Sequence, residues 1–313
     1  MAEPEIFPFF VGSGRSGTTL FQAIFSAHPE LAICHESRFI VPFAGRRRRY
    51  ERAGRIDLDV LVADLSRSSE FGRMGVQPEL VRRRLRDEAT TFAGAVRLIF
   101  ALYAAEQGKQ RYGDKTPGYI SHLPLLAGLF PEARFVHVIR DGRDVALSYL
   151  EQRFGPRNVT EAAIYWRTRV RRGRAAGSRL GPEQYREVRY EALIAEPQAT
   201  VAELCSFLEL VPVEGMLEYF DDAPRLLAQT YDPEAHRSIA LPLTRGLRDW
   251  RNQMSAEDVV AFEALAGDLI DELEYERGFS RIGFRNKIRA PLSRIRWQVR
   301  RAAALGKVGR QPV

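Results

Sequence analysis

The stretch Phe7-Pro8-Phe9-Phe10-Val11-Gly12-Ser13-Gly14-Arg15-Ser16-Gly17-Thr18-Thr19-Leu20 decides the fold of this 313-residue chain. Its apolar first half predicts a buried strand, its three glycines predict a tight loop, and Thr18 begins a helix expected over residues 18–27. A loop of this kind aims backbone N–H groups inward, and the helix that follows adds the positive end of its dipole. The sequence therefore predicts an α/β fold that opens with a phosphate-binding strand, loop and helix.

The spacing of this loop matches the P-loop pattern G-x-x-x-x-G-K-[ST] except at one position. Thr18 stands where the pattern has the lysine that reaches a β- or γ-phosphate, whereas Thr19 keeps the hydroxyl that follows it. The cradle thus predicts binding of one phosphate and not of a triphosphate. Its expected binding residues are Gly12, Ser13, Gly14, Arg15, Ser16, Gly17, Thr18 and Thr19.

Predicted strands and helices alternate along most of the remaining chain, which is typical of a mostly parallel sheet flanked by helices, with ligands at the carboxyl ends of the strands. We expect one domain over residues 1–280, with a charged helical insertion at about 40–110 that serves as a lid or substrate lobe. The other expected strands cover 31–34, 134–139 and 184–189, and a turn is expected at 112–117. The expected helices cover 119–129, 144–152, 160–176, 197–209 and 255–273, and Ser255 is the expected N-cap of the last one.

Composition fits a large domain that folds in a reducing compartment. With 45% hydrophobic residues the chain can bury a substantial core. Its two cysteines, Cys34 and Cys205, belong to no C-x-x-C or Cys/His cluster, so no disulfide framework or zinc site is signalled. Neither a signal-peptide pattern nor an apolar run long enough to span a membrane is present, and we expect a cytoplasmic protein.

The positive charge of the chain is concentrated at its C-terminal end. Residues 281–313 hold ten Lys/Arg and no Asp/Glu, and removing these ten charges from the total of +7 leaves −3 on residues 1–280. The basic balance therefore does not indicate nucleic-acid binding by the body of the protein. After Pro291, apolar residues at helical spacing alternate with arginines, which predicts a basic amphipathic helix. The pattern leaves open whether this tail contacts an anionic membrane, packs on the body or stays disordered.

Several motifs, in a fixed order, give the chain a family resemblance. The loop from Gly12 to Leu20 resembles the 5′-phosphosulfate loop of sulfotransferases that use 3′-phosphoadenosine 5′-phosphosulfate (PAPS). The Arg140-Asp141-Gly142-Arg143-Asp144-Val145 stretch, continued to Ser148, resembles their 3′-phosphate motif. Tyr190-Glu191-Ala192-Leu193 resembles the Y-E-x-L segment, and Thr244-Arg245-Gly246 with Asp249-Trp250-Arg251 resembles the late loop that closes over the nucleotide. The resemblance implies PAPS as donor, no required metal, and further nucleotide contacts from Arg140, Ser148, Tyr190, Arg245 and Gly246.

The resemblance is closest to the branch that contains the tyrosylprotein and carbohydrate sulfotransferases. The segment from Ser26 to Pro42 is similar to the tyrosylprotein enzymes just after their loop, and this match implies Glu36 as the catalytic base. The cytosolic phenol and steroid enzymes use a Lys-x-His element, whereas Lys115-Thr116-Pro117 has proline in place of that histidine. By the same resemblance Arg15 stabilises transition-state charge and Lys115 meets the bridging oxygen of the departing nucleotide.

Lys115 also has support from residue usage, because the chain has only four lysines among its 47 basic residues. A lysine can give up a proton, whereas a guanidinium cannot, so a lysine in an arginine-rich chain suggests a role in proton transfer. From the residues alone, Glu36 fits an exposed surface carboxylate as well, and Arg140 fits an ion pair with Asp144. Three histidines are alternative bases, of which the second is expected at a helix end and the third in the core: His35, His122 and His137.

Two other functions compete with sulfuryl transfer to an acceptor hydroxyl. A P-loop kinase or nucleotide phosphotransferase would use Asp141 or Asp144 for magnesium, and a noncatalytic protein would bind anionic surfaces through its tail. The acceptor of a sulfotransferase is left open among small molecules, glycans and peptides, because the insertion that would select it contains no motif.

Overall fold

The computed structural model describes residues 6–52, 55–88, 91–230, 232–244 and 248–279. The chain divides into two compact units. The first contains Met1–Ile139 and Arg172–Thr244, and the second contains Arg140–Arg171 and Arg245–Val313. Over the described ranges, no helix has the length and apolar character needed to cross a bilayer. The expected tail lies outside the described residues, and the expected domain boundaries stay a prediction.

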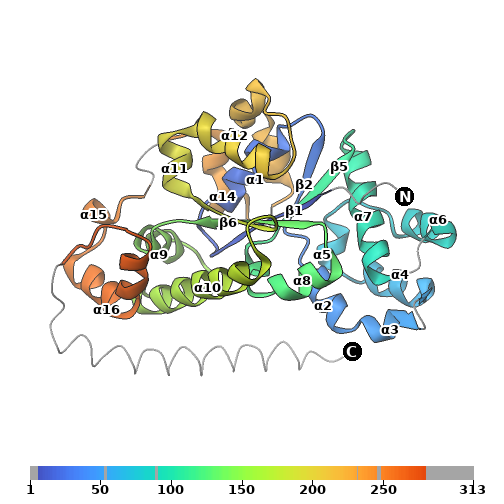
Figure 1. The fold of residues 1–313 in the computed structure, drawn as a ribbon, viewed down its shortest axis with the longest axis horizontal. Helices are drawn as coiled ribbons and strands as arrows, with labels where there is room; N and C mark the ends of the chain where they lie inside the picture. Colours follow the sequence, from blue (N-terminus) through green and yellow to red (C-terminus); the bar gives the residue numbers. More distant parts are fainter. Residues whose placement is uncertain (1–5, 53–54, 89–90, 231, 245–247, 280–313) are drawn as a thin grey trace. The chain divides into compact units, whose positions relative to one another are not determined.

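The first unit is built on a five-stranded parallel sheet with the order β2-β5-β1-β6-β7 (Figure 1). The strand that leads into the glycine loop lies at the centre of this sheet, so the loop emerges at its carboxyl edge between two neighbouring strands. The five strands are β1 (Phe7–Gly12), β2 (Leu31–His35), β5 (Arg111–Lys115), β6 (Ala133–Ile139) and β7 (Tyr185–Arg189).

Both faces of the sheet are covered, which explains the nearly continuous apolar sequence of its central strand. Phe7, Phe9 and Val11 pack into one hydrophobic cluster, which includes most of the insertion. Phe10 points to the opposite face and packs into a second cluster. The second cluster includes side chains of two helices, α1 (Thr18–Ser26) and α12 (Pro197–Phe207). Because side chains alternate along a strand, one apolar run serves two cores.

The insertion is mainly helical, as the sequence predicts, and it also contains a two-stranded hairpin. Its helices are α2 (Ile40–Gly45), α3 (Arg47–Tyr50), α4 (Leu58–Ser66), α5 (Ser69–Gly72), α6 (Pro78–Glu88) and α7 (Phe92–Glu106). The hairpin pairs β3 (Glu51–Arg52) with β4 (Arg55–Ile56). The remaining helical segments of the first unit are η1 (Pro117–Ser121), α8 (Leu123–Leu129), α11 (Tyr190–Ala195), η2 (Glu214–Asp222), α13 (Ala223–Ala228), α14 (Pro233–His236) and η3 (Arg237–Ala240).

The described part of the second unit is helical and begins directly after β6. Asp141 accepts a hydrogen bond from the N–H of Arg143 and caps α9 (Gly142–Leu150). Ser255 caps α16 (Ala256–Glu272) as predicted, since its hydroxyl accepts the N–H of Asp258 at 3.2 Å. The unit also contains α15 (Trp250–Gln253) and the first part of α10 (Val159–Leu180), a helix that continues into the first unit.

The structure confirms the predicted α/β class and nearly all the expected elements, with one clear error. The turn expected at 112–117 is wrong, because Arg111–Lys115 is β5, an inner strand paired with both β1 and β2. The strand contains Gly113, Asp114 and Lys115, residue types that are rare inside sheets. Gly113 fits there because a Cβ at this position would lie 3.0 Å from the carbonyl oxygen of Pro8.

Candidate active site

The glycine loop turns tightly where β1 ends and α1 begins. Gly17 has a left-handed backbone with φ of 95°, and a Cβ at this position would lie 2.4 Å from the ring of Tyr190. A Cβ at Gly12 would lie 2.6 Å from the carbonyl oxygen of Val138 on the adjacent strand. Glycine is therefore required at both positions by close contacts, and the predicted nucleotide-binding residue Tyr190 lies against the loop itself.

The loop offers hydrogen-bond donors at the start of α1. The first N–H groups of a helix have no carbonyl partner within that helix. In addition, the hydroxyl of Ser16 is buried and has no hydrogen-bond partner among the described residues. Ser13 and Thr18 are also buried, so the polar cradle is screened from bulk water. Unfilled, buried donors at a helix N-terminus are typical of an anion-binding site.

Lys115 brings a cation to this cradle from the end of β5. Its side chain is fully buried, and its Nζ lies 3.3 Å from Oγ1 of Thr19 and 3.2 Å from Oε1 of Glu36. Thr19 is in the first turn of α1, and Glu36 directly follows β2. A lysine from the neighbouring strand β5 thus lies at the start of α1, where the loop itself has Thr18 at the lysine position of the P-loop pattern.

Glu36 is held between two cations by a strained backbone. Its Oε2 accepts a hydrogen bond from Arg38, its Oε1 pairs with Lys115, and its N–H donates to the carbonyl of Lys115 at 2.8 Å. Three of the five described non-glycine residues with positive φ belong to this site: Arg15 (69°), Glu36 (47°) and Arg38 (51°). Such conformations cost about 1–3 kcal/mol each and gather at functional sites.

The charges of the site fix the ionisation of its groups. Burial raises the pKa of Glu36, but the positive charges of Lys115 and Arg38 outweigh burial and hold the pKa well below its ordinary value. Glu36 is therefore a carboxylate at neutral pH and can accept a proton. Burial lowers the pKa of Lys115, and Glu36 partly opposes that shift. Burial also raises the pKa of Asp114, the preceding residue, to about 6.

A residue that the sequence analysis missed, His236, joins the same cluster. Its ring lies 5.7 Å from that of His35, edge to face, and Arg15 donates a hydrogen bond at 2.7 Å to the carbonyl of Ala235. Burial and the charge of Lys115 lower the pKa of both histidines, that of His236 to about 3 and that of His35 to about 2. Both rings are thus neutral at pH 7. No periodic pattern surrounds His236. The available signal was that histidine is rare in this chain, with five in 313 residues.

Side-chain atoms of His35, Glu36 and His236 lie within 4.8 Å of one another and could ligate a metal ion. A divalent cation there would compete with Lys115 and Arg38 for the carboxylate of Glu36. The surrounding positive charge therefore suits an anion better than a metal.

His122 and His137 occupy the positions expected from the sequence. His137 is fully buried in β6, its Nδ1 lies 2.6 Å from the hydroxyl of Tyr185, and burial lowers its pKa to about 3. His122 lies at the junction between η1 and α8. Neither residue is part of the cluster around Lys115 and Glu36.

The predicted 3′-phosphate motif lies in the second unit. Arg140 directly follows β6 and Ser148 is on α9, and both are buried. Arg140 forms the ion pair with Asp144 that the sequence left open, at 3.6 Å. The predicted residues Arg245 and Gly246 lie outside the described residues.

Comparisons with known proteins agree with this combination of sheet, loop and charged cluster. The description "Sulfotransferase family" applies to residues 8–214 of the chain. The chain belongs to the sulfotransferase family. The matched range contains the glycine loop, Glu36, Lys115, Arg140 and Ser148.

Two curated relatives are similar to the chain at low sequence identity. Protein-tyrosine sulfotransferase A of Caenorhabditis elegans is 23% identical over 65% of this chain and 50% of its own length. Nodulation protein NoeE of Sinorhizobium fredii is 23% identical over 86% of this chain and 66% of its own length. The chain thus spans about half to two thirds of the length of these curated relatives.

A solved sulfotransferase structure has a similar fold. A sulfotransferase domain from the curacin biosynthetic pathway matches 88% of this chain and 99% of its own length. The TM-score is 0.59 at 18% identity, so the similarity concerns the fold.

Proposed function

We propose that this sulfotransferase-family protein transfers the sulfuryl group of PAPS to an acceptor hydroxyl. The observation that carries the proposal is the position of Lys115, whose Nζ lies 3.3 Å from Oγ1 of Thr19 and 3.2 Å from Oε1 of Glu36. One buried cation thereby touches both the helix start that would bind the 5′-phosphosulfate and the carboxylate that would activate the acceptor. A sulfuryl transferase needs the donor-binding loop on one side of the sulfur and the base for the acceptor on the other.

In the proposed reaction the acceptor oxygen attacks sulfur in line with the bond that breaks. The acceptor O–H proton passes to Glu36 as the new S–O bond forms, which contributes about 10²- to 10⁴-fold in rate. The bond between sulfur and the bridging oxygen breaks, and Lys115 donates a hydrogen bond to that oxygen as negative charge develops there. The products are a sulfate ester and adenosine 3′,5′-bisphosphate, and no electrons are gained or lost.

In this proposal, the ion pair between Lys115 and Glu36 is the state of the site before the donor binds. While Lys115 holds the carboxylate, the pKa of Glu36 is low and the carboxylate is a weak base. A bound donor would offer Lys115 the bridging oxygen as a second acceptor, and the hold of Lys115 on Glu36 would weaken. Arg15, at the middle of the loop, would then compensate charge on the sulfuryl oxygens.

The 3′-phosphate of the donor would be bound by Arg140 and Ser148, with further contacts from Tyr190, Arg245 and Gly246. Hydrogen bonds to charged groups contribute about 1.5–3 kcal/mol each. Two such contacts are enough to favour PAPS over nucleotides without a 3′-phosphate by about 10²-fold or more. No metal is needed for this proposal, because arginine, lysine and backbone N–H groups supply the positive charge.

The contacts of Asp141 and Asp144 disfavour the kinase alternative. Both carboxylate oxygens of Asp141 accept hydrogen bonds from Arg143. Asp144 accepts the N–H of Trp250 and pairs with Arg140. The two aspartates that could bind magnesium are therefore already engaged, and Thr18 still occupies the lysine position of the loop.

Acceptor and location remain broader proposals. We propose a hydroxyl of a small molecule, glycan or peptide as acceptor, and relatives named protein-tyrosine sulfotransferases make a tyrosine phenol the first acceptor to assay. We also propose a cytoplasmic protein whose tail, residues 281–313, gives it peripheral membrane contact. Deleting the tail should release the protein from anionic vesicles and leave sulfuryl transfer intact, whereas a purely noncatalytic surface binder would lose its only activity.

Thermal unfolding with nucleotides tests the proposed donor. Adenosine 3′,5′-bisphosphate at about 100 times its Kd should stabilise the protein by about 2.7 kcal/mol, a Tm increase of about 5–10 °C. We expect this shift with and without magnesium, and we expect ATP to give a much smaller one. A magnesium-dependent shift with ATP alone would support the kinase function instead.

A further inference from the structure

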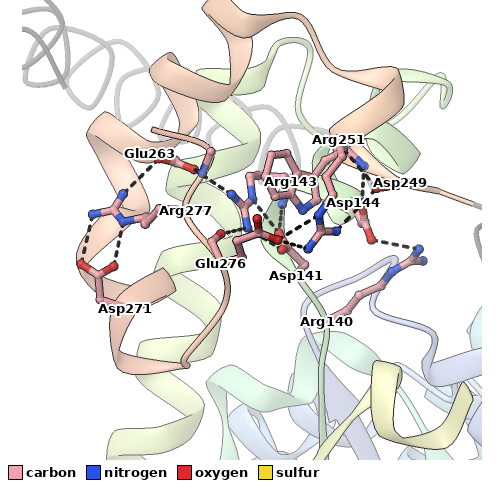
Figure 2. Close-up of polar contacts among 12 residues, drawn as sticks. Arg140, Asp141, Arg143, Asp144, Asp249, Arg251, Glu263, Asp271, Glu276 and Arg277 are labelled. Carbon is pink, nitrogen blue, oxygen red and sulfur yellow. Dashed lines mark hydrogen bonds and ion pairs between the residues drawn. The ribbon is translucent and has the colours of Figure 1, made fainter. Parts of the chain in front are cut away.

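Two aspartates, three residues apart in the motif Arg140-Asp141-Gly142-Arg143-Asp144, have different partners in the structure (Figure 2). Asp141 is engaged by Arg143, which donates to its two oxygens at 3.0 and 2.7 Å. Arg143 also donates to Glu263 at 2.7 Å and to the carbonyl of Glu276 at 2.7 Å. Asp141 thus belongs to a buried structural cluster.

Asp144 instead joins Arg140 to the segment that contains Trp250. Its Oδ1 accepts the N–H of Trp250 at 2.9 Å, and its Oδ2 lies 3.6 Å from the guanidinium of Arg140. Figure 2 shows Arg140 away from the Arg143 cluster and linked to this part of the unit through Asp144. The backbone of Arg140 is held separately, because the indole of Trp166 donates to its carbonyl at 3.0 Å.

Asp144 lies beside both predicted phosphate ligands. Asp144 and Ser148 are four residues apart in α9, and residues at this spacing lie on one face of a helix. Arg140 precedes the first turn of α9 and is joined to Asp144 by the ion pair between their side chains. All three side chains are largely buried, with 9% and 14% of the Arg140 and Asp144 side chains exposed.

We propose that Asp144 is a positioning residue that aims the guanidinium of Arg140 at the 3′-phosphate and thereby sets the preference for a 3′-phosphorylated donor. This inference rests on the proposed function, in which Arg140 binds that phosphate. An arginine side chain has many rotamers, and a fixed carboxylate on one side selects those that face Ser148. The same carboxylate anchors the N–H of Trp250, so the orientation of Arg140 is tied to the start of α15.

The opposing effect is repulsion between the Asp144 carboxylate and a phosphate dianion. Both Asp144 oxygens face donors, one from Trp250 and one from Arg140, so much of their charge is already compensated. A partly buried, compensated carboxylate that orients a cation should assist phosphate binding more than it repels the phosphate.

The test compares adenosine 3′,5′-bisphosphate with adenosine 5′-phosphate, because only the first carries the 3′-phosphate. In Asp144→Asn the amide oxygen can still accept the N–H of Trp250, but the charge that orients Arg140 is lost. We expect calorimetric affinity for the bisphosphate to fall about tenfold and affinity for the monophosphate to stay within about twofold. Glu151→Gln removes a carboxylate that pairs with Arg248 in the same unit, and this control should change neither affinity.

A double-mutant cycle with Arg140→Ala separates this inference from the proposed function. If the wild-type protein does not prefer the bisphosphate, or Arg140→Ala leaves that preference intact, the proposed 3′-phosphate site is wrong. If Arg140→Ala removes the preference but Asp144→Asn does not, only the role of Asp144 is overturned. We expect Asp144→Asn to have no further effect in the Arg140→Ala background. Should Asp144→Asn not fold, Asp144→Glu keeps the charge and must give a preference above that of Arg140→Ala; an equal preference would overturn the role.

Discussion

Among the described residues, two buried clusters, one around Arg143 and one around Lys115, differ in how many of the cation's N–H donors have an acceptor. In the second unit, the Arg143 guanidinium donates four hydrogen bonds to two carboxylates and a carbonyl, and it stacks 3.5 Å from the centre of the Trp250 ring. In the first unit, Lys115 has three N–H donors but only two acceptors among the described residues, Thr19 and Glu36.

This difference indicates that the Arg143 cluster stabilises the fold and that the Lys115 cluster is suited to binding and catalysis. A cluster in which four of the five guanidinium donors are used, and in which the cation also stacks on an aromatic ring, resists change. A cluster with a free donor, a strained carboxylate and an unfilled serine hydroxyl retains capacity that a bound anion would take up. Changes in the Lys115 cluster should therefore impair turnover, and changes in the Arg143 cluster should impair stability.

The largest expected effect is on turnover. Glu36→Gln removes the proposed base, so kcat should fall about 10²- to 10⁴-fold in a sulfate-transfer assay with PAPS. Affinity for adenosine 3′,5′-bisphosphate should stay nearly unchanged, because Lys115 and the glycine loop remain. Glu30→Gln, at an exposed glutamate, is the matched control and should transfer sulfate normally. Normal transfer by the Glu36 variant itself would remove this residue as the base.

The second expected effect is on stability. Arg143→Met leaves two buried carboxylates, Asp141 and Glu263, without their shared cation. Breaking a buried ion pair costs about 3–5 kcal/mol, so Tm should fall by roughly 6–20 °C in a calorimetric scan.

Arg167→Met is the control for burial. Arg167 donates to both oxygens of Asp268 at 3.1 and 2.6 Å, but Asp268 is 52% exposed. Exposed pairs contribute about 0–1 kcal/mol, so this variant should melt within a few degrees of the wild type. Equal losses in the two arginine variants would show that burial does not distinguish the two ion pairs.

Sequence reasoning succeeded where one local pattern determines structure. The apolar run before Gly12 and the three glycines after it were sufficient to place the central strand, the loop and the start of α1. The capping residue Ser255 likewise placed the start of α16.

Sequence reasoning failed where tertiary contacts decide. Asp114 and Lys115 favoured a turn over a strand, because their burial depends on partners 77 and 96 residues away in sequence, Ser37 and Thr19. His236 comes from a segment of short helical turns without periodicity, and its proximity to Glu36 is a property of the folded chain.

The smallest expected effect is a pH dependence of stability caused by Asp114, which belongs to the Lys115 cluster. This carboxylate is fully buried beside Lys115 and accepts the N–H of Ser37 at 3.2 Å. Burial raises its pKa from the ordinary 3.8 to about 6. Between pH 4 and 6 the folded state therefore binds protons that the unfolded state has lost, and the free energy of unfolding falls as the pH rises. At 1.36 kcal/mol per pKa unit, the loss is about 3 kcal/mol at neutral pH.

Asp114→Asn should remove this pH-dependent loss, since an amide has no proton to release. In urea unfolding, the stability of the variant relative to the wild type should increase by about 3 kcal/mol between pH 4 and 7. Asp59→Asn removes an exposed carboxylate that pairs with Arg82, and it is the control for loss of an exposed charge. A constant difference between Asp114→Asn and wild type across this range would mean that Asp114 titrates alike in both states. Lys115 and the N–H of Ser37 would then compensate its charge fully, and this side of the site would be as complete as the Arg143 cluster.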